Sequence, residues 1–188
     1  MTTMTVMPRG TDEWTVHDLD GLPEDGLQYE LLDGILLVTP APVPLHQRAL
    51  GNLHLLLRAA CPPELEVFLA PIDWQPDLRT SLQPDLLVVR RELVGVKNIT
   101  RPLELAVEIL SPSTHRKDTM LKASRYAEAG IGSFWVVDPG TVGDAGPTVT
   151  VHSLRDRSYV PTAHAARAET ITTERPFTVT ITPDELVH

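Results

Sequence analysis

The chain has 188 residues, 42% of them hydrophobic, and a formal net charge of −9. This length supports one sizeable core but not two ordinary domains. The negative charge argues against tight nucleic-acid binding through phosphate neutralisation alone. The single cysteine, Cys61, excludes an internal disulfide. Neither a signal-peptide pattern nor an apolar run of about 20 residues is present, so we expect a cytoplasmic protein without a membrane span.

The first elements expected are a short helix and a hairpin. Residues 1–13 show no periodicity, so we expect a flexible N-terminus followed by one domain over residues 14–188. Thr15 is suited to cap a short amphipathic turn or helix. The run YELLDGILLV then predicts two short strands joined at Asp33-Gly34, because glycine accepts the positive φ of a tight hairpin.

The rest of the chain alternates helical and strand-like patterns. Helical spacing over 45–60 predicts a long helix, and strand-like runs follow at 66–74, 84–89 and 103–110. The last two runs are apolar enough to lie at the centre of a sheet, covered on both faces. A second helix over 119–130 should end at Gly130, with four residues near one face: Met120, Leu121, Ser124 and Ala127.

Four more strand-like runs occupy the C-terminal part, at 133–138, 148–154, 158–165 and 177–188. Strands combined with two long helices predict an α/β fold with a mixed sheet flanked by helices. Cations gather in two groups, which are typically solvated faces that balance nearby acids. The groups are Arg90, Arg91, Lys97 and Arg101, and Arg116, Lys117, Lys122 and Arg125.

Two acids, Asp85 and Glu108, occupy strand positions in apolar runs. A buried ionised carboxylate is costly unless a cation, hydrogen bonds or solvent compensate it. Two carboxylates on neighbouring strands would share a proton or bind a divalent metal, and hard oxygen ligands favour Mg²⁺, Mn²⁺ or Ca²⁺. Structural roles remain open as well, with Asp85 opening a turn and Glu108 paired to Arg116 or Lys122.

Five features of the sequence are distinctive: YELLDG, His46 at the start of a helix, PDLLVV, VEILSPSTHRKD and KASRYAEAGIGSFWVVDP. Together they resemble the Uma-two family, a branch of the PD-(D/E)xK nuclease superfamily. The resemblance runs from Trp14 to Pro183 and is most specific over residues 84–139. It implies a restriction-endonuclease-like domain with additional C-terminal strands, a Mg²⁺ or Mn²⁺ cofactor, hydrolysis of DNA phosphodiester bonds and a homodimer.

The resemblance also implies roles for individual residues. Asp85 and Glu108 match the motif acids, and with the main-chain carbonyl of Ile109 they would hold the metal. Leu110 stands where the superfamily has its lysine, two residues after the second acid. Lys122 on the following helix matches the lysine that takes over in Uma-like sequences, although a structural salt bridge is equally open.

Further residues are possible additions to this site. Glu30 could be an extra metal acid or lie at a strand edge in solvent. His46 could contact a phosphate, bond a carboxylate or cap its helix. Asp118 and Ser111 could support the site or only cap the helix start. Two further cations, Arg116 and Lys117, would hold flanking phosphates without reading bases.

Two other functions remain open. A non-catalytic nucleic-acid-associated or assembly module is favoured by the net charge of −9 and by Leu110. A metal-dependent hydrolase of a small phosphate compound is favoured by the absence of a broad basic surface.

Overall fold

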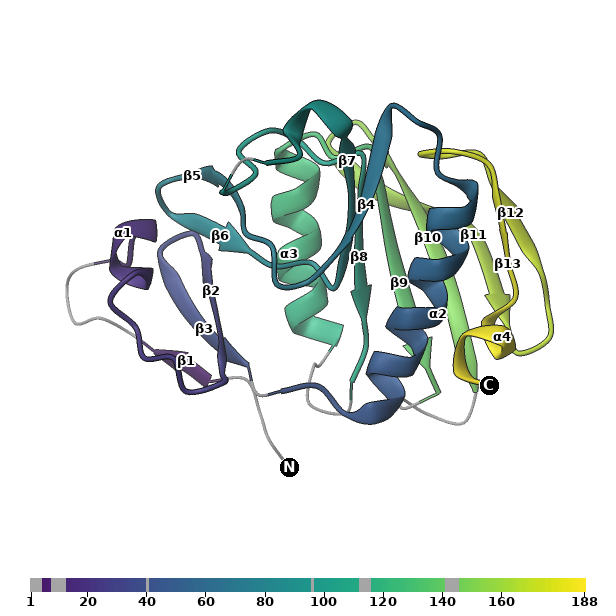
Figure 1. Ribbon diagram of the computed structural model, residues 1–188, viewed down its shortest axis with the longest axis horizontal. Coiled ribbons are helices and arrows are strands. Elements are labelled where there is room, and N and C mark those ends of the chain that lie inside the picture. The colour runs from purple at the N-terminus through teal and green to yellow at the C-terminus, as the bar shows by residue number, and fades with distance from the viewer. Residues whose placement is uncertain (1–4, 8–12, 40, 96, 112–115, 141–145) are drawn as a thin grey trace.

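The computed structural model describes residues 5–7, 13–39, 41–95, 97–111, 116–140 and 146–188, with backbone only at 5–7 and 116–118. A six-stranded sheet lies at its centre (Figure 1), in the order β11-β10-β9-β8-β7-β4. Only β8 and β9 pair in parallel among these neighbours, so the sheet is mixed as expected. Its strands are β4 (Leu65–Leu69), β7 (Leu86–Arg90), β8 (Leu105–Ile109), β9 (Ser133–Pro139), β10 (Pro147–Arg155) and β11 (Ser158–Ala166).

A second sheet of five strands has the order β1-β3-β2-β6-β5. The predicted hairpin is present, with Asp33 at φ 50° and Gly34 at φ 83° in its turn. Residues 5–7, which we expected to be flexible, pair with β3 in an antiparallel ladder. The strands are β1 (Thr5–Met7), β2 (Gln28–Leu32), β3 (Ile35–Thr39), β5 (Trp74–Asp77) and β6 (Thr80–Leu82); a separate hairpin joins β12 (Ile171–Thr173) to β13 (Val179–Ile181).

The described helices are α1 (Val16–Leu19), α2 (Pro44–Ala60), α3 (Arg116–Glu128) and α4 (Pro183–Val187), with a 3₁₀ turn at Arg91–Leu93. The carboxylate of Asp18 accepts hydrogen bonds from the N–H and the hydroxyl of Thr15, and the first of these is the N-cap N–H bond of a capping box. Gly130, at φ 80°, follows the end of α3 as predicted. No helix in the described part of the chain is long and apolar enough to cross a membrane.

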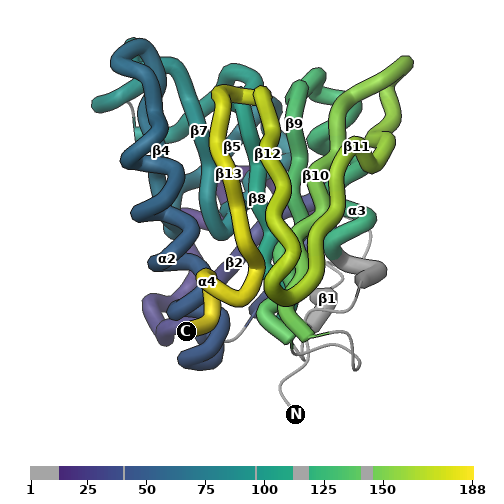
Figure 2. Tube along the Cα trace, turned by 90° about the vertical axis from the view of Figure 1, so that its right-hand side faces the viewer, coloured from purple at the N-terminus to yellow at the C-terminus, as the bar shows by residue number. Residues whose placement is uncertain are grey.

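The six-stranded sheet is covered on both faces (Figures 1 and 2). One face packs against α2, α4 and β13, with Leu86 and Val88 of β7 pointing into this cluster. The other face packs against α3 and the five-stranded sheet, with Leu87 and Val89 pointing the opposite way. Because successive strand residues alternate between faces, Ala106 and Glu108 of β8 lie on the α3 face.

Three local expectations were wrong. The run 66–74 is not one strand, because β4 ends at Leu69 and β5 begins at Trp74 in the other sheet. The last residues form α4, which begins at Pro183, and not a strand. The side chains of Met120 and Leu121 are 71% and 57% exposed, so the buried face of α3 is a different one.

Candidate active site

Asp85 directly precedes β7, and Glu108 lies near the end of the neighbouring strand β8. The antiparallel register of β7 and β8 pairs Leu86 with Val107. Continuing this register by one residue places Asp85 across from Glu108, where Cβ atoms are typically about 5 Å apart. The two acids are therefore close to each other, and Asp85 supplies part of the electrostatic effect that raises the pKa of Glu108.

Two groups fix the carboxylate of Asp85. The backbone N–H of Ile109 donates to Oδ2 at 2.7 Å, and Nε2 of His46 lies 3.2 Å from Oδ1. His46 therefore bonds a carboxylate, while Val43 occupies the N-cap position of α2. The side chain of Asp85 is 19% exposed and that of Glu108 only 6%, so solvent is more accessible from the Asp85 side.

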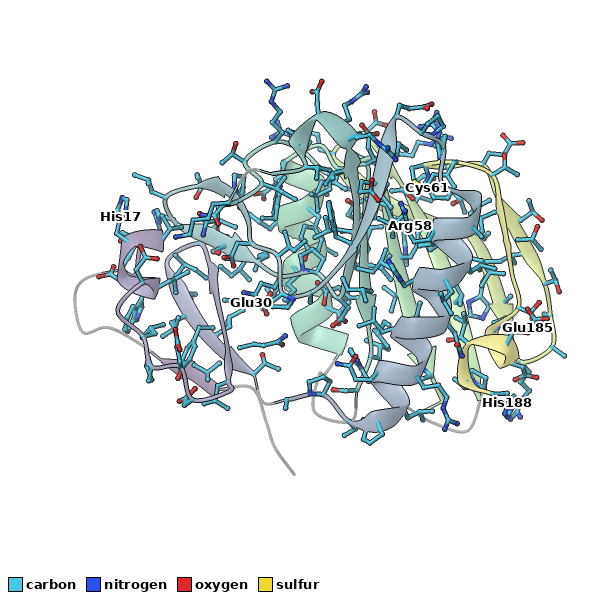
Figure 3. All side chains as sticks on the ribbon, viewed as in Figure 1. His17, Glu30, Arg58, Cys61, Glu185 and His188 are labelled. Atoms are coloured by element: carbon cyan, nitrogen blue, oxygen red, sulfur yellow. The ribbon has the colours of Figure 1, made fainter. Side chains whose placement is uncertain are left out.

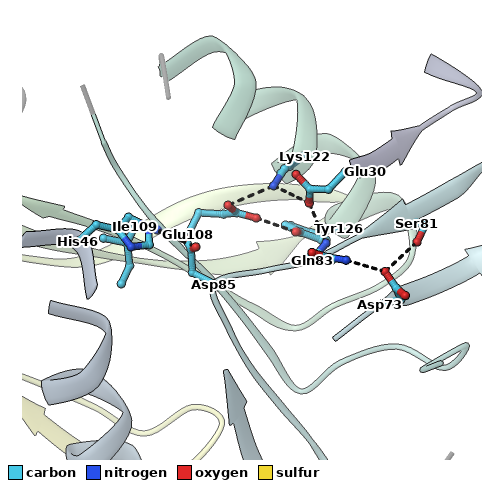
Figure 4. Close-up of polar contacts among 10 residues, drawn as sticks. All are labelled: Glu30, His46, Asp73, Ser81, Gln83, Asp85, Glu108, Ile109, Lys122 and Tyr126. Atoms are coloured by element: carbon cyan, nitrogen blue, oxygen red, sulfur yellow. Dashed lines mark hydrogen bonds and ion pairs between the residues drawn. The ribbon is translucent and has the colours of Figure 1, made fainter. Parts of the chain in front are cut away.

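The carboxylate of Glu108 receives two donors from α3 (Figure 4). The hydroxyl of Tyr126 donates to Oε1 at 2.7 Å, and Nζ of Lys122 lies 3.4 Å from Oε2. Nζ of Lys122 also lies 2.8 Å from Oε1 of Glu30 on β2. Residues 122 and 126 are four positions apart, so their side chains project from the same face of the helix.

Glu30 is buried between the five-stranded sheet and α3 (Figure 3), with 3% of its surface exposed. Its Oε1 accepts from Lys122 and also from the backbone N–H of Gln83, at 2.7 Å. Because Glu30 is buried, it does not lie at a strand edge in solvent, which was the alternative for this residue. The side chain of Gln83 continues the polar contacts by donating to Asp73, which also accepts from Ser81 (Figure 4).

The acids and Lys122 of this cluster shift one another's pKa values. Burial raises the pKa of Glu108, Lys122 opposes this effect, and the charges of Asp85 and Glu30 add to it, giving a pKa of about 7. Burial lowers the pKa of Lys122, but the carboxylates of Glu108 and Glu30 more than offset this and raise its pKa above the ordinary value. Lys122 is therefore cationic, and its ammonium contacts the carboxyl groups of Glu30 and Glu108.

This donor set suits a hard divalent cation bound partly by protein. Among the described residues, no three or more His, Cys, Asp or Glu side chains form a metal-binding group. Mg²⁺, however, is usually held by one or two carboxylates and keeps several waters. Each carboxylate oxygen retains a lone pair beyond its present hydrogen bond. Asp85 and Glu108 therefore fit a two-carboxylate site.

The other predicted residues have varied surroundings. Leu110 is buried, and its N–H donates to the carbonyl of Val137, so this position supplies no cation. Ser111 is also buried. The predicted contacts of Arg116, Lys117 and Asp118 concern side chains that lie outside the described residues.

Most of the cations in the two predicted groups are paired with acids where the structure describes their side chains. Arg125 contacts Asp33, Asp77 and Glu128 at the junction of α3 with the two hairpins of the small sheet. The first group is paired throughout, which supports its interpretation as a solvated face. Its pairs are Arg90–Glu104, Arg91–Glu66, Lys97–Asp20 and Arg101–Glu92.

Sequence reasoning did not identify Tyr126 or Gln83 as part of the site. The only signal for Tyr126 was its spacing of four residues from Lys122, which places both on one helical face. Gln83 contacts Glu30 through its backbone N–H, an interaction that the side-chain identity does not reveal.

Comparisons with known proteins agree with this architecture. The chain matches the Uma2 family model, described as "Putative restriction endonuclease", over residues 16–184. A crystal structure of a "putative nuclease belonging to DUF820" from Anabaena variabilis ATCC 29413 has a TM-score of 0.72 at 16% identity, covering 92% of this chain and 97% of that one. At this identity the likeness concerns the fold. No curated protein matches the chain. The matched family model spans most of the sequence, and the chain belongs to the Uma2 family.

Proposed function

We propose that this protein is a metal-dependent endonuclease that hydrolyses phosphodiester bonds of DNA. Its membership of a family described as restriction endonucleases supports a nuclease activity. The observation that carries the proposal furthest is the contact of Lys122 with Glu108, which stands opposite Asp85. A cation from α3 thus reaches the acidic pair, although Leu110 occupies the position expected for lysine.

Asp85 and Glu108, with the main-chain carbonyl of Ile109, would hold one Mg²⁺ or Mn²⁺. When bound, the metal would lower the pKa of a water molecule and neutralise oxygens of the scissile phosphate. A divalent cation would offset the burial and the repulsion from Asp85 and Glu30 that raise the pKa of Glu108, and this favours its binding.

Each neighbouring residue has a role that follows from its contacts. Lys122 would stabilise negative charge that develops on a phosphate oxygen, and Glu30 would hold the ammonium in place. His46 and the N–H of Ile109 would fix the orientation of Asp85. Arg116 and Lys117 would contact flanking phosphates from the first turn of α3.

The assay that tests this function combines metal titration with cleavage of plasmid DNA. Calorimetry should detect Mn²⁺ binding to the parent and none to Asp85→Asn. Nicked and linear DNA should accumulate with the parent only when Mg²⁺ or Mn²⁺ is supplied. Metal binding without cleavage of any DNA or RNA substrate would favour the non-catalytic module. The absence of both metal binding and cleavage would contradict the metal site as well.

A second candidate function is hydrolysis of a small phosphate compound. It is favoured by the cations of the first group, Arg90, Arg91, Lys97 and Arg101, which all contact acids and so offer few free charges to a long polyanion. Parallel assays on plasmid DNA and on nucleotides distinguish the two functions. Faster turnover of a nucleotide, with no nicking of the plasmid, would favour this candidate.

The assembly of the protein stays a prediction. We propose a cytoplasmic homodimer, on the basis of the family resemblance and the strands beyond residue 148, which exceed a minimal nuclease core. Light scattering of the parent at micromolar concentration tests it, because one chain has a mass of 20.7 kDa. A measured mass near that of one chain would contradict the dimer.

A further inference from the structure

Tyr126 has the shortest contact with Glu108 among those described and is held rigidly. The residue is fully buried, and its hydroxyl donates to Oε1 of Glu108 at 2.7 Å. Its ring packs against Trp74 and Phe134, with ring centroids 5.4 and 5.7 Å away. Because neighbours restrain the ring, the hydroxyl is a fixed donor at one side of the carboxylate.

Lys122, by contrast, is held more closely by Glu30 than by Glu108. Its Nζ lies 2.8 Å from Glu30 and 3.4 Å from Glu108, whereas a close contact between an ammonium and a carboxylate is about 2.7–2.9 Å. All three side chains are at least nine-tenths buried. In such surroundings opposite charges attract strongly, and two interactions compete with closer approach: Glu30 holds the ammonium, and Tyr126 holds the carboxylate of Glu108.

We propose that Tyr126 is a positioning residue that keeps Glu108 from closing onto Lys122. The phenol binds one carboxylate oxygen and sets the direction of the group. With that donor in place, Glu108 stays beside Asp85, and Lys122 stays chiefly with Glu30 (Figure 4). The consequence for metal binding rests on the proposed function, since the orientation matters when Glu108 and Asp85 hold one cation.

The effect of losing the phenol follows from these contacts. Without it, Glu108 would rotate toward the ammonium and form a close ion pair with Lys122. That closer pair would draw the carboxylate of Glu108 away from Asp85. Interactions that orient a metal ligand typically change metal affinity by about 10- to 100-fold when removed.

The chain offers a matched control in Tyr159. Its hydroxyl donates to the carbonyl of Ile131 at 2.8 Å, and its ring stacks on Phe134 with a centroid distance of 5.2 Å. Tyr126→Phe and Tyr159→Phe therefore each remove one phenolic hydrogen bond from the same aromatic group. Only the first removes a contact to the acids.

Crystal structures of the metal-free variants test the geometry directly. In Tyr126→Phe the distance from Lys122 Nζ to Glu108 should shorten from 3.4 Å to about 2.8 Å, and in Tyr159→Phe it should not change. A Glu108 carboxylate that keeps its orientation in Tyr126→Phe would overturn the proposal. A structure of Lys122→Met provides an independent measurement, because Glu108 should remain bonded to Tyr126; a carboxylate that leaves the phenol there would also overturn it.

Calorimetry with Mn²⁺ tests the consequence for the metal. Tyr126→Phe should weaken binding by about 10-fold, and Tyr159→Phe by less than about twofold. In the Lys122→Met background, Tyr126→Phe should change the Mn²⁺ affinity by less than about twofold, because no ammonium remains to pair with Glu108. An equal loss in both backgrounds would contradict a role that acts through Lys122. The parent could bind no Mn²⁺ while the Tyr126→Phe crystal shows Glu108 closed onto Lys122. In that case the positioning role of Tyr126 would stand and the metal proposal would fall.

Discussion

Replacing Lys122 with Met removes the charge at the centre of the site while retaining much of the apolar stem. The side chain is 8% exposed and contacts Glu30 and Glu108, so its loss leaves two buried carboxyl groups without their cation. Breaking a buried ion pair in this way typically costs about 3–5 kcal/mol. For a chain of this size that loss lowers the melting temperature by about 6–20 °C. Mg²⁺ should restore part of it, since a divalent cation would neutralise Glu108, one of these two acids.

Cleavage kinetics then separate catalysis from stability. At a temperature where the variant is folded, Lys122→Met should lower turnover by about 10²-fold or more without weakening Mg²⁺ binding. The matched control is Lys97→Met, because Lys97 is 83% exposed and 3.7 Å from Asp20, an ion pair of little energetic consequence. A folded Lys122→Met protein that cleaves at the parental rate would refute the assignment of Lys122 and direct attention to Lys117.

Other substitutions test the neighbouring residues. Asp85→Asn should abolish both Mn²⁺ binding by calorimetry and DNA cleavage, while a variant that retains both would exclude Asp85 as a ligand. His46→Gln should weaken Mn²⁺ binding by about 10-fold or more, because Asp85 loses a partner that orients it; unchanged affinity would argue for a purely structural histidine. Glu30→Gln should lower turnover more than metal affinity, since Glu30 contacts Lys122 and not Asp85. Glu108 has a folded-state pKa of about 7, above its ordinary 4.5, so the stability it contributes at low pH is lost as pH rises through 7. Glu108→Gln should therefore gain stability over the metal-free parent between pH 5 and 8.5, by up to about 3 kcal/mol in chemical denaturation, and a pH-independent difference would contradict the raised pKa.

The positions of Asp85 and Glu108 beside or within apolar strands could be predicted, because each is a charge next to a strong apolar pattern. Asp85 directly precedes the apolar strand β7 and Glu108 lies within β8, and the strands themselves are identified by composition. The hairpin at Asp33-Gly34 and the end of α3 at Gly130 were likewise predicted, since their conformations depend on local glycine chemistry. These features are encoded within a few residues.

What could not be predicted depends on contacts between distant segments. Periodicity assigned Met120 and Leu121 to the buried face of α3, on the assumption that helices bury apolar side chains. This helix instead turns Lys122 and Tyr126 inward, because the acids beneath it provide polar partners. The partner of Lys122 at Glu30 is 92 residues away and belongs to the other sheet. No local sequence pattern specifies the contact between Lys122 and Glu30.

A crystal structure with Mn²⁺ tests the central claim most directly. Anomalous density should appear between the carboxylates of Asp85 and Glu108, with metal–oxygen distances of about 2.0–2.3 Å and the Ile109 carbonyl as a further ligand. Crystals of Asp85→Asn, soaked in parallel, should show none. If the parent showed no density there at saturating Mn²⁺, with Asp85 still bonded to His46 and Glu108 to Tyr126, the acids would form a structural network and the metal-dependent mechanism would be contradicted.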